Sequence, residues 1–512
     1  MNSSKQLKFG AVMSYFTIAF NMIAGLIYTP WMIEQIGQSN YGLYTLATSL
    51  ITLFVMDFGM SAAVTRFLSK YRAEGNQEAI NNFLGLVYKL YLLIDAVILS
   101  ALIVVSFFIN KIYDNLTATE LDTFKVLYVI VGLFSVISFP FTNLNGILTS
   151  HEKFAGLKLS ELFHKTFIIV AMVIALLMGY GVYALVIVNA VSGLLTILIK
   201  LIIIRRKTDV RVNFKYKDKN LFKEIFGFSA WTTISSIAQR LIFNITPSII
   251  TAVSVTGTIG VAIFGLAQTI EGYVYTFATA INGMFMPRIS KLVHENKKDT
   301  DLMNLMIRVG RLQCIIIGVL VVGFISFGKS FIVDIWNKPN FTDSYICAVL
   351  LIIPSFFFLP FQIANTTLVV ENKVKLNAFI SIVVGVLNVI LSTFLSRRWG
   401  AFGATASIFI VYMIRNVLYV IIFKKVLNLD MLKFIKATYF KITPFLLLSM
   451  GVGLCLEYFN PMNSGVLRFA VNGIVFVAFF AVVMLLFVMN KSEKDLVFGT
   501  MNKVLRKLKS VR

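Results

Sequence analysis

Residues 182–207 read VYALVIVNAVSGLLTILIKLIIIRRK. The first 23 of these residues contain one charged side chain, that of Lys200, and three consecutive basic residues follow them. A helix of about 20 apolar residues can cross a bilayer, and a basic cluster at its end is typical of the cytoplasmic side. Thirteen further apolar runs, separated by polar or basic residues, predict an all-α polytopic membrane protein of about fourteen spans. The expected spans are 9–30, 41–64, 83–108, 124–148, 160–178, 182–204, 226–252, 259–285, 309–333, 344–369, 376–395, 401–423, 440–459 and 466–489.

The composition of the 512 residues agrees with this class, since 58% are hydrophobic and only 14% are charged. That balance leaves too little polar surface for a soluble enzyme. The three histidines and three cysteines are scattered without metal-ligand spacing, and no Walker-type phosphate loop occurs. We therefore expect no enzyme activity, no metal and no cofactor. The net charge of +23 is assigned to membrane topology and contact with membrane lipids rather than to nucleic acid.

The positions of the lysine and arginine residues predict the orientation of the chain in the membrane. With the N-terminus inside, 38 of the 47 basic residues fall in or beside cytoplasmic segments, seven lie outside, and Arg240 and Arg415 fall within spans. Because cytoplasmic loops carry the excess of positive charge, both termini are predicted to lie in the cytoplasm. The run 9–30 has no small-residue cleavage site and is predicted to be an uncleaved first span.

The second half of the chain repeats landmarks of the first half. The matched pairs, at offsets of 217 to 221 residues, are Thr29-Pro30 with Thr246-Pro247, Gly37 with Gly257, Ser69-Lys70 with Ser290-Lys291, and Gly181 with Gly400. Each repeat holds six helices, an even number, so both copies have the same orientation, as in transporters that bind substrate between two halves. The predicted domains are an N-terminal bundle 1–212, a C-terminal bundle 213–425, and two added helices with a basic tail, 426–512.

Several segments, taken in order along the chain, resemble a known family. They are MDFG at 56–59, RFLSKY at 66–71, MPRISK at 286–291, LNVIL at 387–391 and WGAFGATA at 399–406. They look like bacterial polysaccharide flippases, which export lipid-linked oligosaccharides in O-antigen, lipopolysaccharide and capsule pathways. The same superfamily holds the lipid II flippases and the multidrug and toxic compound extrusion (MATE) transporters.

The resemblance implies a MATE-like pair of six-helix bundles in the bacterial cytoplasmic membrane. It also implies a substrate, a polyprenyl-diphosphate-linked oligosaccharide that is moved from the cytoplasmic to the outer leaflet by alternating access. A polysaccharide polymerase and glycosyltransferases are the partners that such a pathway would supply. Coupling to protons or to sodium is open at this point.

Arg240 is the first candidate substrate ligand, because a charge within the bilayer is costly and such residues are functional candidates by default. Ser236, Arg240 and Asn244 recur every four residues, which places them on one face of the predicted seventh helix. A guanidinium forms paired, charge-assisted hydrogen bonds with phosphate. We therefore expect Arg240 to contact the diphosphate, with Asn244 beside it.

The predicted eighth helix carries a second polar face. Gln268, Glu271, Tyr275 and Asn282 share it at spacings of three, four and seven residues. Gln268 is a candidate for substrate binding. Three roles are open for Glu271: neutralising Arg240, taking up a proton during transport, or binding a cation.

Further polar residues inside predicted spans have alternative roles. Arg415 is a second candidate for the diphosphate, with a structural tie to a backbone carbonyl at a helix break as the alternative. The family pattern gives Asp57 a gating or packing role, and Arg66 could pair with acidic groups or attract phosphate. Asp95 is expected to belong to an ion pair. Five amides could bind sugars or join helices, namely Asn21, Asn189, Gln362, Asn365 and Asn388.

Phenylalanines 356–358 and Phe361 surround Pro354 and Pro360 and predict a kinked helix, with lipid contact or a polyprenyl groove as interpretations. Other functions are also open. A cation-coupled drug exporter would favour carboxylates over Arg240 and Arg415. A lipid II flippase would carry basic residues in its first helix, and 9–30 has none. A membrane scaffold or glycosyltransferase fits less well, because the loops are short and mainly basic.

Overall fold

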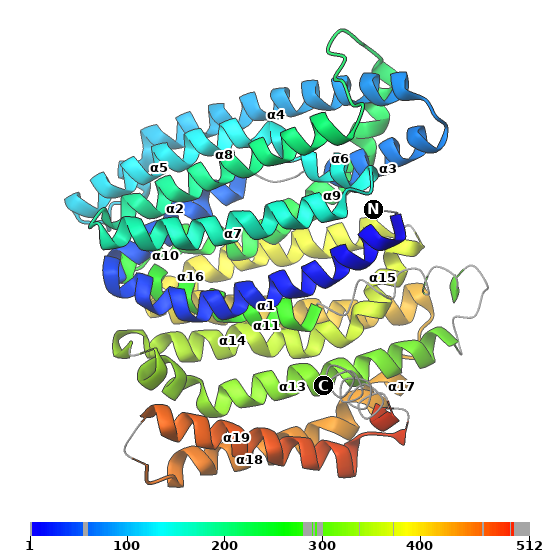
Figure 1. Ribbon diagram of the computed structural model, residues 1–512. Helices are drawn as coiled ribbons and strands as arrows, with labels where there is room; N and C mark the ends of the chain where they lie inside the picture. Colours follow the sequence, from blue (N-terminus) through cyan, green and yellow to red (C-terminus); the bar gives the residue numbers. More distant parts are fainter. Residues whose placement is uncertain are drawn as a thin grey trace, which may run out of the picture. The chain divides into compact units, whose positions relative to one another are not determined.

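The computed structural model describes residues 3–54, 60–279, 289, 292–293, 301–336, 338–371, 373–462, 465–491 and 493–495. Across these residues the chain forms helices and turns, without β-strands (Figure 1). The α-helices are α1 (Ser3–Ile36), α2 (Gln38–Phe54), α3 (Met60–Ala73), α4 (Gln77–Ile112), α5 (Ala118–Ser138), α6 (Leu144–Ser150), α7 (Phe154–Leu177), α8 (Gly181–Lys207), α9 (Lys219–Phe243), α10 (Thr246–Val253), α11 (Gly257–Thr279), α13 (Met303–Ser330), α14 (Asp343–Phe358), α15 (Gln362–Val370), α16 (Val374–Leu427), α17 (Met431–Ile435), α18 (Lys441–Phe459) and α19 (Gly465–Val483). Shorter 3-10 or π turns are η1 (Phe139–Phe141), η4 (Phe331–Ile335), η5 (Pro339–Phe341), η6 (Leu359–Phe361), η7 (Lys436–Phe440) and η8 (Met484–Val488).

The helices account for the predicted membrane spans. A bilayer offers no water to backbone N–H and C=O groups, so a segment that crosses it satisfies these groups within a helix. Nine helices of the described part are long and apolar enough to cross. Among the described residues, the remaining predicted spans overlap α1, α2, α9 and α10 together, α11, and the second pass that α16 makes. The expectation of about fourteen spans is confirmed.

Helix α16 makes two passes. Its apolar part, Lys375–Leu427, has 53 residues, which is about 80 Å at 1.5 Å per residue and more than twice the ~30 Å hydrocarbon core. Gly400 interrupts it with a φ of 55° and a ψ of −130°. A Cβ atom at this position would lie 3.0 Å from the Thr256 hydroxyl oxygen, so glycine suits both the backbone and the space.

The internal repeat is visible in the backbone. Gly37 and Gly257, one matched pair, have φ values of 80° and 49° between consecutive helices. Gly181 and Gly400, another pair, have φ values of 61° and 55°. A positive φ is accessible to glycine at little cost, so both copies use the residue for the same turns.

A further repeated feature joins helix pairs through proline. The 3-10 turn η1 connects α5 to α6 and contains Pro140, and η6 connects α14 to α15 and contains Pro360. These two prolines are 220 residues apart, the same offset as that between Gly37 and Gly257. Proline removes a helical hydrogen bond, so each pair bends at the same point.

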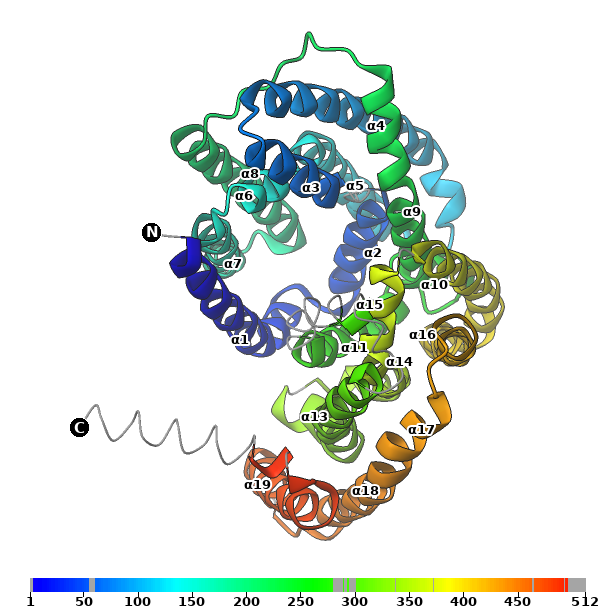
Figure 2. The same cartoon turned by 90° about the vertical axis from the view of Figure 1, so that its right-hand side faces the viewer.

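The chain forms two compact units. Unit 1 contains Met1–Leu266 and Val374–Val411, and unit 2 contains Ala267–Lys373 and Tyr412–Arg512. In unit 1, α1, α7, α8, α5 and α2 pack in turn to form a ring, as Figure 2 shows in a view along the helices. In unit 2, α13 packs against α14, α18 and α19. These units are defined by the contacts between residues, whereas the domains expected from the sequence were defined by the internal repeat. The expected domain boundaries at residues 212 and 425 therefore stay a prediction.

The last two long helices, α18 and α19, are tied to α13 and η4 at both ends (Figure 1). At one end Arg311 forms an ion pair with Glu493 at 2.7 Å, and Arg311 also donates to the carbonyls of Ala437 and Val488. At the other end Arg468 contacts Asp334 at 2.8 Å. The two added helices are therefore integral to unit 2.

Candidate functional site

Arg240 and Asn244 lie where α9 ends. Arg240 is in the last turn of the helix, and its guanidinium donates to the carbonyl of Thr52 in α2. Asn244 caps α9, and α10 begins two residues later with Pro247 in its first turn. The predicted span 226–252 divides into α9 and α10, so Arg240 lies near the end of one helix and not within a single continuous helix. A cation is favoured at this position by the partial negative charge of a helix C-terminus.

Arg415 lies between two aromatic rings in unit 2. Its guanidinium carbon is 3.8 Å from the centre of the Tyr412 ring and 4.3 Å from that of Phe358. Its Nε is buried and has no hydrogen-bond partner among the described residues. Stacking on aromatic faces stabilises the cation while leaving N–H groups available in the guanidinium plane.

The structural tie considered for Arg415 is made by its neighbour. The side-chain amide of Asn416 donates to the carbonyl of Pro354 at 3.1 Å. Pro354 lies inside α14, so this hydrogen bond ties α16 to the backbone of that helix. Asn416 therefore joins the two helices, and Arg415 is left for another role.

Glu271 shares unit 2 with Arg415. The carboxylate is 9% exposed and interacts electrostatically with Arg415, although no direct ion pair joins these two described residues. Gln268 lies on the same helix, α11, and is half-buried. Arg240 belongs to unit 1, so its pairing with Glu271 stays a prediction.

The other candidate residues have varied environments. Asp57 lies outside the described residues. Arg66 is exposed on α3, and its guanidinium lies 5.9 Å from the centre of the Phe67 ring. Asp95 is 9% exposed, and its Oδ1 has no hydrogen-bond partner among the described residues. The expected ion pair of Asp95 is therefore not formed within the part of the chain that the structure describes.

The amides differ in their surroundings, and their binding of sugars stays a prediction. Asn388 donates to the carbonyls of Leu241 and Ile242 and accepts from Ser407, so it joins helices. Asn21 and Asn189 line a cavity, and Asn189 also joins α8 to α2 by donating to the hydroxyl of Tyr44 at 3.3 Å. The distinction depends on which helices surround each residue, and sequence spacing carries no such information.

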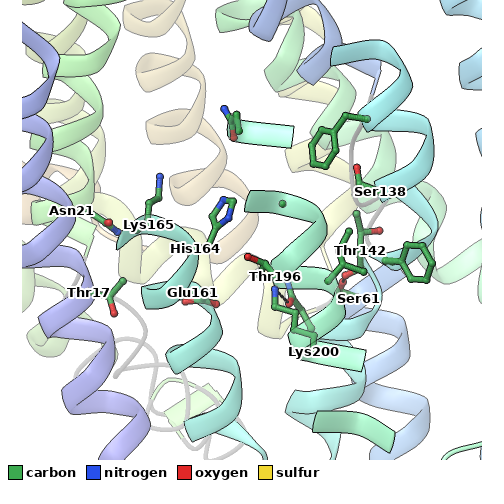
Figure 3. Close-up of a pocket in the computed structure, with 16 residues that line it drawn as sticks. Thr17, Asn21, Ser61, Ser138, Thr142, Glu161, His164, Lys165, Thr196 and Lys200 are labelled. Atoms are coloured by element: carbon green, nitrogen blue, oxygen red, sulfur yellow. Dashed lines mark hydrogen bonds between the residues drawn. The ribbon is translucent and has the colours of Figure 1, made fainter. Parts of the chain in front are cut away.

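Unit 1 contains a polar cavity of 730 Å³, shown in Figure 3 and called here the unit 1 cavity. Twelve of its sixteen lining residues have polar or charged side chains, the other four being Phe134, Phe141, Gly193 and Ile197. The polar residues are Thr17, Asn21, Ser61, Ser138, Thr142, Asn145, Glu161, His164, Lys165, Asn189, Thr196 and Lys200. All of them belong to unit 1, and α1, α7 and α8 supply most of them.

The charged residues of the unit 1 cavity were not among the candidate site residues predicted from the sequence. Lys165 and Lys200 had been counted among the basic flanks, with a span expected from residue 160. Helix α7 begins at Phe154, and Lys165 is the twelfth of its 24 residues. Glu161, His164 and Lys165 lie within five consecutive residues of α7, and this cluster inside the expected span was the signal available in the sequence.

A second cavity, in unit 2, is apolar and has a volume of 670 Å³. Phe357, Phe361, Val420, Tyr439 and Leu447 are among its lining residues, so it lies between α14, α16 and the η7–α18 region. Two of the phenylalanines considered for a polyprenyl groove therefore line an apolar cavity. Pro360 in η6 provides the expected bend beside them.

Comparison with known proteins identifies the family. The family model described as "Polysaccharide biosynthesis protein" matches residues 10–293, more than half of the chain. The chain belongs to this family. An uncharacterised membrane protein of Methanocaldococcus jannaschii is 24% identical over 375 residues, which cover 71% of this chain and 84% of that protein.

Solved structures share the fold of this family member. The lipid II flippase MurJ in an inward closed conformation has a TM-score of 0.71 at 15% identity, covering 93% of this chain and 98% of that chain. An inward-facing MATE family multidrug resistance transporter has a TM-score of 0.65 at 14% identity, covering 81% and 97%. The protein is therefore a multi-pass membrane protein with the fold of these two transporters.

Proposed function

We propose that this protein translocates a polyprenyl-diphosphate-linked oligosaccharide from the cytoplasmic to the outer leaflet of the bacterial cytoplasmic membrane, by alternating access. Membership of the polysaccharide biosynthesis family supports a glycan substrate. O-antigen or capsule synthesis is the proposed pathway, and its polymerase and glycosyltransferases are the proposed partners.

The observation that carries the proposal is the environment of Arg415. Two aromatic rings hold its guanidinium, and Nε has no hydrogen-bond partner among the described residues. A cation within the bilayer is costly unless an anion or dipole satisfies it. The planar fork of a guanidinium matches two oxygens of a phosphate, so a diphosphate would provide the missing partner.

Arg240, Asn244 and Gln268 are proposed to complete the binding of the head group. Arg240 has one N–H group engaged by Thr52, which orients the guanidinium. The two amides offer both donors and acceptors, as sugar hydroxyls require. Glu271 is proposed to balance Arg415 when the substrate is absent, with Asp57 and Arg66 acting in gating or in attracting phosphate.

The apolar cavity of unit 2 is proposed to hold part of the polyprenyl chain. Its walls are made of aromatic and aliphatic side chains. Contact with such a wall allows an isoprenoid to remain in an apolar environment while its diphosphate approaches Arg415. This arrangement requires a groove and a cation in the same unit, and both belong to unit 2.

A test is transport of polyprenyl diphosphate bearing a fluorescent disaccharide in proteoliposomes, together with surface polysaccharide in cells. Arg415→Ala and Arg240→Ala should each lower transport at least tenfold, since loss of a hydrogen bond to a charged group costs about 1.5–3 kcal/mol. Arg240→Lys should recover part of the transport, because it keeps the charge and loses the fork.

The matched control is Arg308→Ala, which removes an exposed arginine of α13. It should transport at the level of the parent protein. Normal transport by Arg415→Ala and Arg240→Ala would refute the head-group role. Export of organic cations in place of the lipid-linked sugar would favour the drug-exporter alternative.

A further inference from the structure

The walls of the unit 1 cavity carry more positive than negative charge. Lys165, Lys200 and Glu161 are the charged lining residues, apart from His164. Glu161 forms an ion pair with Lys158 at 2.9 Å and also acts electrostatically on Lys200, so three lysines share one carboxylate. Two lysine charges therefore remain, and an anion is the partner that would offset their cost inside a membrane protein.

The two lysines are held differently. Lys200 donates to Oδ1 of Asn145 at 2.9 Å, which fixes its ammonium at one side of the cavity. Lys165 forms no hydrogen bond or ion pair with a described residue, and its side chain is exposed to the cavity. An ammonium has three donors, so both lysines retain donors for a ligand.

His164 lies between the lysines and is oriented by α8. Its Nδ1 is 2.9 Å from the hydroxyl of Ser192. Both lysines act on the imidazole electrostatically. Figure 3 shows His164 between Lys165 and Lys200, with Thr17 and Asn21 on the neighbouring helix α1. The three cationic or potentially cationic groups thus come from two adjacent helices.

We propose that the unit 1 cavity binds an oxyanion of the transported head group through Lys165 and Lys200, with His164 beside them. This rests on the proposed function and assigns a second anion subsite, separate from Arg415. The hydroxyls of Thr17 and Thr196 and the amides of Asn21 and Asn189 provide donors and acceptors for sugar around the anion. The volume of 730 Å³ is within the range of about 300–1,000 Å³ for small-molecule sites.

The oxyanion has two sources, the diphosphate of the lipid carrier and the carboxylate of an acidic sugar. Both offer several acceptor oxygens to ammonium groups, so the geometry of the cavity serves either one. Inorganic pyrophosphate and glucuronate are the corresponding probes. Competition between them distinguishes the sources, because displacement of pyrophosphate by glucuronate indicates a carboxylate-accepting site and lack of displacement indicates the diphosphate.

The experiment is calorimetric titration of the full-length protein in detergent with pyrophosphate. Lys165→Gln and Lys200→Gln should each weaken binding at least tenfold, since each removes a charge-assisted hydrogen bond. Glu161→Gln should strengthen binding, because it removes a negative charge from the wall. Lys111→Gln, which removes an exposed lysine at the end of α4, should bind as the parent does.

Each titration is repeated in an Arg415→Ala background, which separates the two subsites. Unchanged pyrophosphate affinity in both lysine variants overturns the unit 1 subsite, whereas loss confined to Arg415→Ala leaves the proposed function standing. Lys165→Arg keeps the charge and should retain binding, which shows that a loss in Lys165→Gln is not a folding defect. Weaker binding in Glu161→Gln would likewise contradict an anion site.

Discussion

Arg415 and Asn416 are adjacent in sequence and have different structural tasks. Asn416 ties α16 to the backbone carbonyl of Pro354 in α14, and Arg415 stacks between Tyr412 and Phe358. The tie joins the two helices, the rings orient the guanidinium, and Glu271 acts on it electrostatically. The head-group role proposed for Arg415 therefore depends on a cation that is oriented by packing and lies near one carboxylate.

Replacing Glu271 tests whether the carboxylate carries a proton or only balances charge. If it carries a proton, Glu271→Gln should abolish the dependence of transport on a pH gradient, since the amide cannot exchange a proton. If it only balances Arg415, transport should fall and its dependence on the gradient should remain. Transport rates in proteoliposomes with and without an imposed pH gradient measure this. A variant indistinguishable from the parent in both respects would remove Glu271 from the mechanism.

At the scale of elements, α18 and α19 are attached by a buried ion pair. Arg311 is 6% exposed and Glu493 is fully buried at 0%. Glu493 also accepts from the backbone N–H of Asn490, so both carboxylate oxygens have partners. A buried pair of this kind rarely adds net stability over an apolar substitute, but it fixes one arrangement of the elements. The two added helices thus belong to unit 2 as a permanent part of its packing.

Breaking this pair should destabilise the protein strongly. Glu493→Ala leaves the charge of Arg311 buried and unpaired, which costs about 3–5 kcal/mol. The measurement is unfolding in detergent followed by intrinsic fluorescence. Asp122→Ala is the control, because Asp122 pairs with Lys125 at an exposed position where a salt bridge contributes about 0–1 kcal/mol. Equal stability of the two variants would show that the pair does not hold the helices.

At the scale of the whole molecule, the distribution of charge predicts which side faces the cytoplasm. Cysteine labelling in intact cells tests it after exposed Cys455 is replaced by serine, while Cys314 and Cys347 are buried. Asp122→Cys and Asp343→Cys should react from outside, since both positions are exposed at helix starts on the predicted external side. Lys217→Cys should react only in permeabilised cells, because its loop is predicted to be cytoplasmic.

Ser39 and Thr342 also lie in segments that are predicted to be external, but they are less suitable for labelling. Ser39 donates to the carboxylate of Glu120 and lies 3.1 Å from the hydroxyl of Thr258, so a cysteine there would disturb three helix ends. The aspartates avoid this effect. Labelling of Lys217→Cys from outside would invert the predicted orientation of the loops after α8.

The helical class, the number of spans and the repeat follow from local features of the sequence. The length of an apolar run and the recurrence of glycines at 37, 181, 257 and 400 can be read without coordinates, and the bilayer imposes helices on any segment that crosses it. The candidates Arg240 and Arg415 were also accessible, because a charge within an apolar run is conspicuous without coordinates.

The interaction partners of the charged side chains, in contrast, depend on the tertiary structure. Lys165 of α7 lines one cavity together with Lys200, which comes from α8. Glu493 finds Arg311 across 182 residues of sequence, and Arg415 acquires its two rings from α14 and α16. Burial and pairing depend on which helices become neighbours. That choice is made by the packing of the entire chain and is not encoded in the spacing of any one segment.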